Sequence, residues 1–225
     1  MIRRRRRLPA RVSGAVLAAG LLLAGCSAAD ASSAGQTGHD HDAGITVEGP
    51  QGKYAGVDLP TPYQRPTFTL TDTSGASFDF AAQTAGRPTL LFFGYTNCPD
   101  VCPATMADVA LAFRRLDKSV AEQVQMVFVT TDPTTDTPAV LGEYLHRFDA
   151  DLPVRFIGLT GDQGSIDRAQ LSAGVPLAED MGRTHSTELL LYGADDEAHV
   201  AFLAGNTAAD IATDLKTVVT GSAGK

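Results

Sequence analysis

The chain has 225 residues, 44% of them hydrophobic and 20% charged, and its formal net charge is −8. This length and composition suit one globular domain with an additional tail. The negative charge, with no basic patch beyond the first residues, argues against nucleic-acid binding. Three cysteines are too few for a disulfide scaffold.

The N-terminus has the pattern of a bacterial export signal. A basic head is followed by an apolar segment at 14–23, which is too short to span a bilayer as a mature helix. The Leu-Ala-Gly-Cys sequence that ends at Cys26 resembles a lipoprotein signal, in which the cysteine receives a lipid. Ordinary secretion with a stray cysteine is the alternative. We predict a signal peptide over 1–25 and a lipid anchor at Cys26, on the extracytoplasmic face of the cell membrane.

Residues 26–57 are rich in Ser, Ala, Gly and Asp and are expected to form a flexible tether. His39 and His41, each followed by an aspartate, have side chains that bind divalent metals. The favoured interpretation is nevertheless a solvated linker, because no ordered scaffold would hold these ligands. The folded domain is expected over 58–221, with a short tail at 222–225.

The domain alternates short apolar runs with segments of helical periodicity. We expect, in chain order, a hairpin (67–70 and 77–80), a buried strand (89–93), a helix from about 103, a strand (126–129), a helix from 138, a strand (156–159), a helix (164–173), a hairpin (188–192 and 200–203) and a last amphipathic helix (208–219). This order predicts an α/β protein with a thioredoxin-like fold and an added N-terminal β-hairpin.

Two cysteines lie where the buried strand at 89–93 leads into the following helix. Cys98 is in the connecting loop and Cys102 is at the helix entry, where backbone N–H groups and the positive end of the dipole favour a thiolate. Their spacing is C-x-x-x-C, one residue longer than the C-x-x-C of thioredoxin-type enzymes. Two thiolates suit Cu(I) or Zn, but a structural zinc site needs four ligands. Two sulfurs and one imidazole would instead suit Cu(I).

The candidate imidazole is His185, which precedes a predicted strand. It lies on the loop where thioredoxin carries a cis-proline opposite its cysteines, and residues 183–187 contain no proline. His146, on a predicted helix, and His199, at the start of a hairpin strand, are expected at the surface. Cys98, Cys102 and His185 are therefore the predicted metal ligands.

Three blocks resemble the Sco/SenC family of copper chaperones: F-G-Y-T-N-C-P-D-V-C-P at 93–103, D-P-T-T-D-T-P at 132–138 with Tyr144, and H-S at 185–186 with L-L-Y at 190–192. The resemblance implies a metallochaperone that carries Cu(I) or Cu(II) on Cys98, Cys102 and His185 and delivers it to the CuA site of cytochrome c oxidase. It also implies thiol–disulfide activity toward that site. The implied partners are the oxidase subunit carrying CuA, a copper donor and a thiol reductase.

Some neighbouring residues have open roles. Thr184 stands where the family usually has an aspartate before the histidine, which removes a residue that could orient the imidazole. Asp132 either interacts with the metal or its ligands or is a turn residue. Asp100 either raises the pKa of the thiols through its charge or is a turn residue.

Three alternatives without metal delivery also agree with the sequence. The first is a thiol–disulfide oxidoreductase or redox sensor in which Cys98 and Cys102 form the redox pair. The second is a peroxidase in which Cys98 is oxidised and then resolved by Cys102. The third is an exported binding module with a purely structural disulfide.

Overall fold

The computed structural model describes residues 52–180 and 186–222. Signal peptide 1–25, Cys26, most of the expected tether with His39 and His41, and His185 lie outside these residues. The elements are β1 Val57–Gln64, β2 Thr69–Asp72, β3 Ser77–Asp79, α1 Phe80–Thr84, β4 Thr89–Gly94, α2 Val101–Arg114, α3 Lys118–Ala121, β5 Gln125–Thr130, α4 Pro138–Asp149, β6 Ile157–Thr160, α5 Gln163–Ser172, β7 Leu189–Tyr192, β8 Glu197–Phe202 and α6 Ala208–Ser222.

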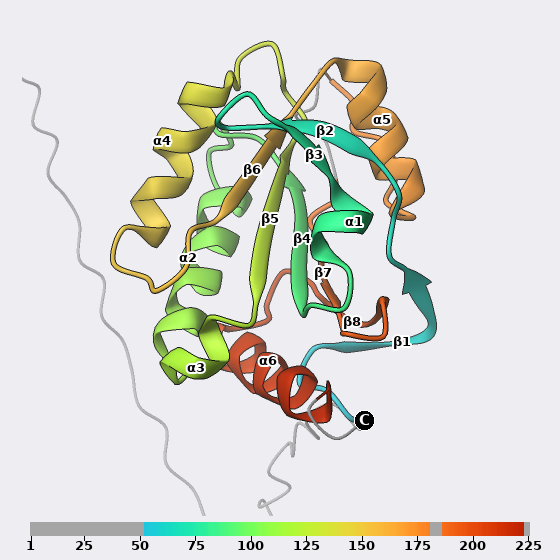
Figure 1. Cartoon of the computed structure of the whole chain (residues 1–225), viewed down its shortest axis with the longest axis vertical. Coiled ribbons are helices and arrows are strands. Elements are labelled where there is room, and N and C mark those ends of the chain that lie inside the picture. The colour runs from blue at the N-terminus through green and yellow to red at the C-terminus, as the bar shows by residue number, and fades with distance from the viewer. Residues whose placement is uncertain (1–51, 181–185, 223–225) are drawn as a thin grey trace, which may run out of the picture. The chain divides into compact units, whose positions relative to one another are not determined.

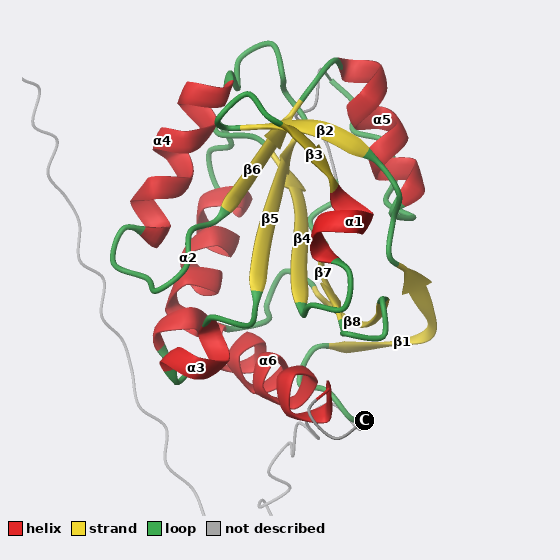
Figure 2. Cartoon of the chain, in the orientation of Figure 1, coloured by secondary structure: helices red, strands yellow, loops and turns green. Residues whose placement is uncertain are grey.

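The strands form one mixed sheet in the order β1-β8-β7-β4-β5-β6-β2-β3. β4 lies in its interior, parallel to β5 and antiparallel to β7, and all of its residues are buried, as the apolar run predicts. The expected N-terminal hairpin is confirmed as β2 and β3, which join the sheet through β6 (Figure 2). The cysteine loop follows the carboxyl end of β4, and α2 begins directly after it.

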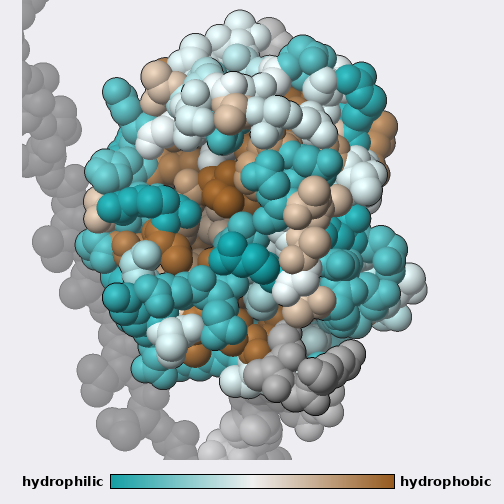
Figure 3. All heavy atoms as spheres, viewed as in Figure 1, coloured by the Kyte–Doolittle hydropathy of each residue, from teal (hydrophilic) through white to brown (hydrophobic). Residues whose placement is uncertain are grey.

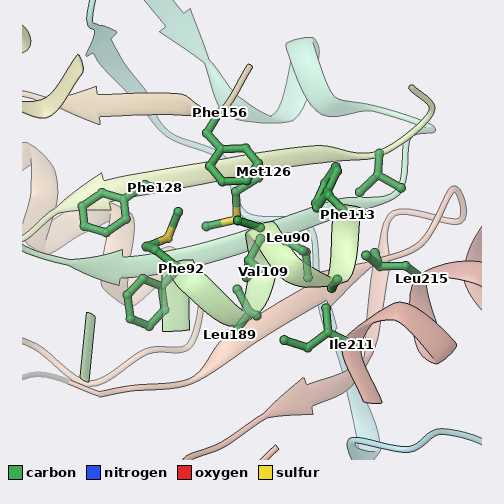
Figure 4. Packing of buried hydrophobic residues seen from close by; sticks show 14 of the residues in the cluster. Leu90, Phe92, Val109, Phe113, Met126, Phe128, Phe156, Leu189, Ile211 and Leu215 are labelled. Carbon is green, nitrogen blue, oxygen red and sulfur yellow. The ribbon is translucent and has the colours of Figure 1, made fainter. Parts of the chain in front are cut away.

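Helices cover both faces of the sheet. Figure 1 shows α2, α4 and α6 on one side and α1 and α5 on the other. The core on the first side includes Met106, Val109 and Phe113, which recur at helical spacing in α2. Figure 4 shows Val109 and Phe113 among side chains of β4, β5 and α6. Polar side chains make up most of the surface seen in Figure 3, with hydrophobic atoms visible between them. Within the described residues, no helix combines the length and hydropathy needed to cross a bilayer.

The strand β1 was not expected. Its sequence contains Pro60 and Pro62, which lack backbone N–H groups and weaken the strand pattern. The structure tolerates them because β1 is an edge strand that pairs with β8 on one side only, and its register is interrupted between Asp58 and Tyr63. The short helices α1 and α3 were also not expected from the sequence.

The packed chain begins before Asp58. Tyr54 belongs to the main core, and the N–H groups of Ala55 and Gly56 each donate a hydrogen bond of 2.8 Å to the buried carboxylate of Asp214 on α6. These contacts join residues about 160 positions apart in the chain. The expected tether therefore includes residues that are in fact ordered. Their composition is that of a linker, and the hydrogen bonds to α6 that order them cannot be read from neighbouring residues.

Candidate metal centre

Cys98 and Cys102 lie at the position that the sequence predicts, between β4 and α2. Cys98 is half-buried in the loop, and Cys102 is the second residue of α2 and is buried; both are free cysteines. The backbone N–H of Cys102 donates to Cys98 Sγ at 3.4 Å, and the two thiols are also in hydrogen-bonding contact. The start of α2 therefore brings the two sulfurs together.

The two thiols have opposite acidities. Burial disfavours the Cys98 thiolate, but hydrogen bonds from the N–H groups of Cys102, Asp100 and Val101 and from the Cys102 thiol together outweigh it, so its pKa lies below the ordinary value. Burial raises the pKa of Cys102 strongly, and its contact with Cys98 and the nearby charge of Asp136 add to this effect. Cys98 is therefore the accessible and nucleophilic sulfur of the pair.

Gly94 makes the room that the Cys102 thiol occupies. A Cβ atom at this last residue of β4 would lie 2.9 Å from Cys102 Sγ and 2.8 Å from a ring carbon of Phe92. Side-chain atoms do not approach one another so closely without displacement. Glycine is needed here because of this close approach, since any larger residue would displace the buried sulfur.

The carboxylate of Asp136 holds the cysteine loop to the sheet. It accepts hydrogen bonds from the N–H and hydroxyl of Thr96, at 2.9 and 2.5 Å, and from the hydroxyl of Thr130 at the end of β5, at 2.7 Å. Asp136 and Thr137 directly precede α4, and both are residue types that can cap a helix N-terminus. The structure uses Thr137, whose hydroxyl accepts from the N–H of Val140. The anchoring role of Asp136 was missed, although this residue belongs to the D-P-T-T-D-T-P block.

The phenol of Tyr144 lies in the same core cluster as Cys102. Its ring stacks at a tilt against Phe128 with centroids 5.6 Å apart, and its hydroxyl is buried without a hydrogen-bond partner among the described residues. Burial raises the pKa of Tyr144, and the charges of Cys102 and Cys98 raise it further. The hydroxyl therefore stays protonated at neutral pH.

Asp132, His146 and His199 do not all lie where the sequence predicts. Asp132 is buried after β5, and its carbonyl accepts from the N–H groups of Thr135 and Asp136, which is the behaviour of a turn residue. His146 is exposed on α4, as expected. His199 lies inside β8 and not at its start, because β8 begins earlier than the hydropathy pattern indicates, and its side chain is partly exposed beside Asp195.

The fold and the paired thiols define a thioredoxin-like protein with its dithiol at a strand-to-helix junction. The model of the SCO1/SenC family matches residues 58–220, and the chain belongs to this family. A protein of Stutzerimonas stutzeri named for copper binding is 36% identical over 143 residues, which are 61% of this chain and 68% of that protein. The SCO2-like protein of Rickettsia felis is 38% identical over 99 residues, which are 44% of this chain and 45% of that protein.

Solved structures agree with this assignment. Yeast Sco1 with copper bound is 26% identical, with a TM-score of 0.62, and covers 71% of this chain and 90% of its own. Bradyrhizobium japonicum ScoI with copper bound is 33% identical, with a TM-score of 0.58, over 69% of this chain and 99% of its own. BsSco, a member of the Sco family of cytochrome c oxidase assembly proteins, is 26% identical with a TM-score of 0.55, over 73% of this chain and 98% of its own.

Proposed function

We propose that this protein binds copper through Cys98 and Cys102, with His185 as the third ligand, and delivers it to the CuA site of cytochrome c oxidase. The observation that carries the proposal is the contact between the two thiols at the start of α2. Two adjacent sulfurs are soft donors that suit Cu(I). His185 lies outside the described residues, so its inclusion depends on its place in the sequence before β7.

The resemblance to copper-bound relatives supports copper as the cargo. Yeast Sco1 and B. japonicum ScoI were both solved with copper bound, and both share this fold. A disulfide between Cys98 and Cys102 would remove two ligands at once, so metal loading and oxidation exclude each other. Outside the cytoplasm disulfides persist. A thiol reductase must therefore keep the pair reduced before a copper donor can load it.

Delivery would take place by ligand exchange at the membrane. Cysteines of the acceptor would replace Cys98 first, because it is the more exposed sulfur, and Cys102 afterwards. The relationship to BsSco supports a role in oxidase assembly. A lipid on Cys26 would hold the protein at the extracytoplasmic face, near an acceptor in the same membrane. Cys26→Ser should then release the mature protein from the membrane fraction.

A copper titration of the reduced mature protein tests the metal assignment. We expect one Cu(I) per chain, and a thiolate-to-copper charge-transfer band when Cu(II) is used. Cys98→Ser and Cys102→Ser should each abolish stoichiometric binding, and His185→Ala should weaken it by at least about tenfold. His146→Ala is the matched control, because it removes an exposed histidine of α4 and should change nothing. Stoichiometric Cu(I) in the double serine variant would refute the assignment.

The unequal acidities of the thiols favour a second activity, disulfide reduction in the partner. The Cys98 thiolate would attack one sulfur of a partner disulfide and form a mixed disulfide. Cys102, after losing its proton, would attack Cys98 and release the partner as a dithiol, so that two electrons pass from this protein to the partner. If the dithiol form of the protein reduces an acceptor disulfide but takes up no copper, disulfide reduction is its function.

A further inference from the structure

We propose that Asp195, Glu197 and His199 form a second metal site, which takes a divalent transition-metal ion of the Zn²⁺ class. These residues occupy the turn between β7 and β8 and the first part of β8. One donor atom from each lies within 4.8 Å of the other two. Two carboxylates and an imidazole are a donor set for borderline divalent metals, unlike the two sulfurs of the cysteine pair.

Two of the three donor separations are close to those of a zinc site, and the third is at most 4.8 Å. His199 Nε2 lies 3.0 Å from Asp195 Oδ2 and 3.6 Å from Glu197 Oε2. Zn–N and Zn–O bonds of about 2.1 Å in a tetrahedral arrangement place neighbouring ligand atoms about 3.4 Å apart. A zinc ion therefore fits among these three atoms with small side-chain adjustments. The three side chains are between one-third and one-half exposed, so an ion can reach them from solvent.

Hydrogen bonds orient each carboxylate with one oxygen toward His199. Glu197 Oε1 accepts from Gln64 Nε2 of β1 at 2.7 Å, which leaves Oε2 beside the imidazole. Asp195 Oδ1 accepts from the N–H of Glu197 at 3.3 Å, which leaves Oδ2 free to face the imidazole of His199. Metal ligands in proteins are commonly oriented by such outer hydrogen bonds. Because the two carboxylates are already oriented, binding an ion would cost less side-chain conformational entropy.

The turn that carries the cluster is anchored to the core by Arg65. This side chain is buried, pairs with Asp196 at 2.6 Å and donates to the carbonyl of Gly193 at 2.8 Å and to the hydroxyl of Thr84 at 2.7 Å. Asp196 has a φ of 63°, in the left-handed region, so the sharp turn depends on this anchor. The donors thus stand on a fixed turn.

A β-bulge directs His199. Tyr192 pairs with Ala198 and Leu191 with Val200, so His199 is the extra residue of β8 at this point. Bulges turn a side chain away from the regular alternation of a strand. Asp195 and His199 also line a cavity of about 320 Å³, together with Lys53 and Thr217. The open coordination positions of the ion would face this cavity, where water or a small anion near Lys53 completes them.

The second site is separate from the cysteines. Thr89, at the start of β4, pairs with Tyr192 beside the turn, whereas Cys98 follows the other end of β4. Six residues of strand separate the two ends, a length of about 20 Å. Metal binding at the turn therefore does not depend on the proposed copper function, and each can fail without the other.

The test uses the mature chain with Cys98→Ser and Cys102→Ser, so that the thiols take up no zinc. Isothermal titration with Zn²⁺ alone should give one equivalent attributable to the turn. His199→Ala and Glu197→Gln should each lower that affinity by at least about tenfold. In nitrogen-15 spectra of the folded protein, the imidazole signals of His199 should move as one equivalent of Zn²⁺ is added.

His146→Ala is the control, because His146 Nδ1 lies 3.4 Å from Asp149 on α4 in a histidine–aspartate pair. It should retain the zinc equivalent, and its imidazole signals in the parent protein should not move. Equal zinc binding by His199→Ala and its parent would overturn the proposal. So would His199 signals that stay unchanged at saturating Zn²⁺, in which case the cluster is an ion pair only.

Discussion

The carboxylate of Asp136 accepts two hydrogen bonds from Thr96, a residue forty positions earlier in the chain. One comes from the backbone N–H, at 2.9 Å, and the other from the hydroxyl, at 2.5 Å. This contact joins the loop that carries Cys98 to the turn before α4, and the hydroxyl of Thr130 adds the end of β5. Asp136 therefore acts as a positioning residue for the cysteine pair.

Asp136→Asn should loosen the cysteine loop. The amide group of asparagine places an NH₂ against donors that now bond to a carboxylate, so the free energy of unfolding should fall by about 1–3 kcal/mol. The N–H groups that stabilise the Cys98 thiolate should also lose their alignment. We expect slower alkylation of Cys98 by iodoacetamide at neutral pH, measured by mass spectrometry.

Asp149→Asn is the matched control for this change. Asp149 is also a buried aspartate and accepts from the N–H of Phe156 at 2.7 Å, but it lies at the end of α4 away from the cysteine loop. It should lower stability and leave the alkylation rate of Cys98 unchanged. If both variants slow alkylation equally, general destabilisation explains the effect and the positioning role fails.

The two cysteines should differ in the pH dependence of their reactivity. Because the pKa of Cys98 lies below the ordinary value, its thiolate is present at lower pH, and the rise of its alkylation rate should have a midpoint below that of an unperturbed cysteine thiol. Burial raises the pKa of Cys102, so its rate should remain low through neutral pH. Each rate can be measured in the variant that lacks the other cysteine. Coinciding profiles would contradict the predicted difference.

Gly94→Ala should disturb the metal centre from within the core. The added methyl group would collide with Cys102 Sγ and Phe92, and overpacking of this kind costs about 1–3 kcal/mol. Because the displaced atom is a proposed ligand, copper affinity should fall together with the midpoint of chemical denaturation. Copper affinity equal to that of the parent protein would show that the thiol does not depend on this space.

Gly142→Ala provides the comparison for that experiment. Gly142 lies within α4, and a Cβ there would be 3.7 Å from its nearest neighbour, Thr73, which is ordinary contact. Alanine is a better helix former than glycine by about 1 kcal/mol, so this variant should be slightly stabilised and should bind copper normally. A loss of copper binding in Gly142→Ala would mean that the effect at Gly94 is not specific.

Local patterns were sufficient for most elements of the fold. The apolar run at 89–93 and the helical spacing of Met106, Val109 and Phe113 depend on neighbours a few residues away, so the sequence predicts them directly. The position of the cysteines follows from the same patterns. β1 could not be predicted, because it is stabilised by pairing with β8, more than a hundred residues later.

The amino-acid sequence by itself determined the alternation of strands and helices, the placing of Cys98 and Cys102 at a strand-to-helix junction, and the family resemblance. Each of these depends on residues that are close in the chain. Only the tertiary structure decided that Asp136 anchors the cysteine loop, that Gly94 makes room for the Cys102 thiol, and that His199 meets Asp195 and Glu197 on an anchored turn. These relationships depend on strand register, burial and distant hydrogen bonds, which no local pattern encodes.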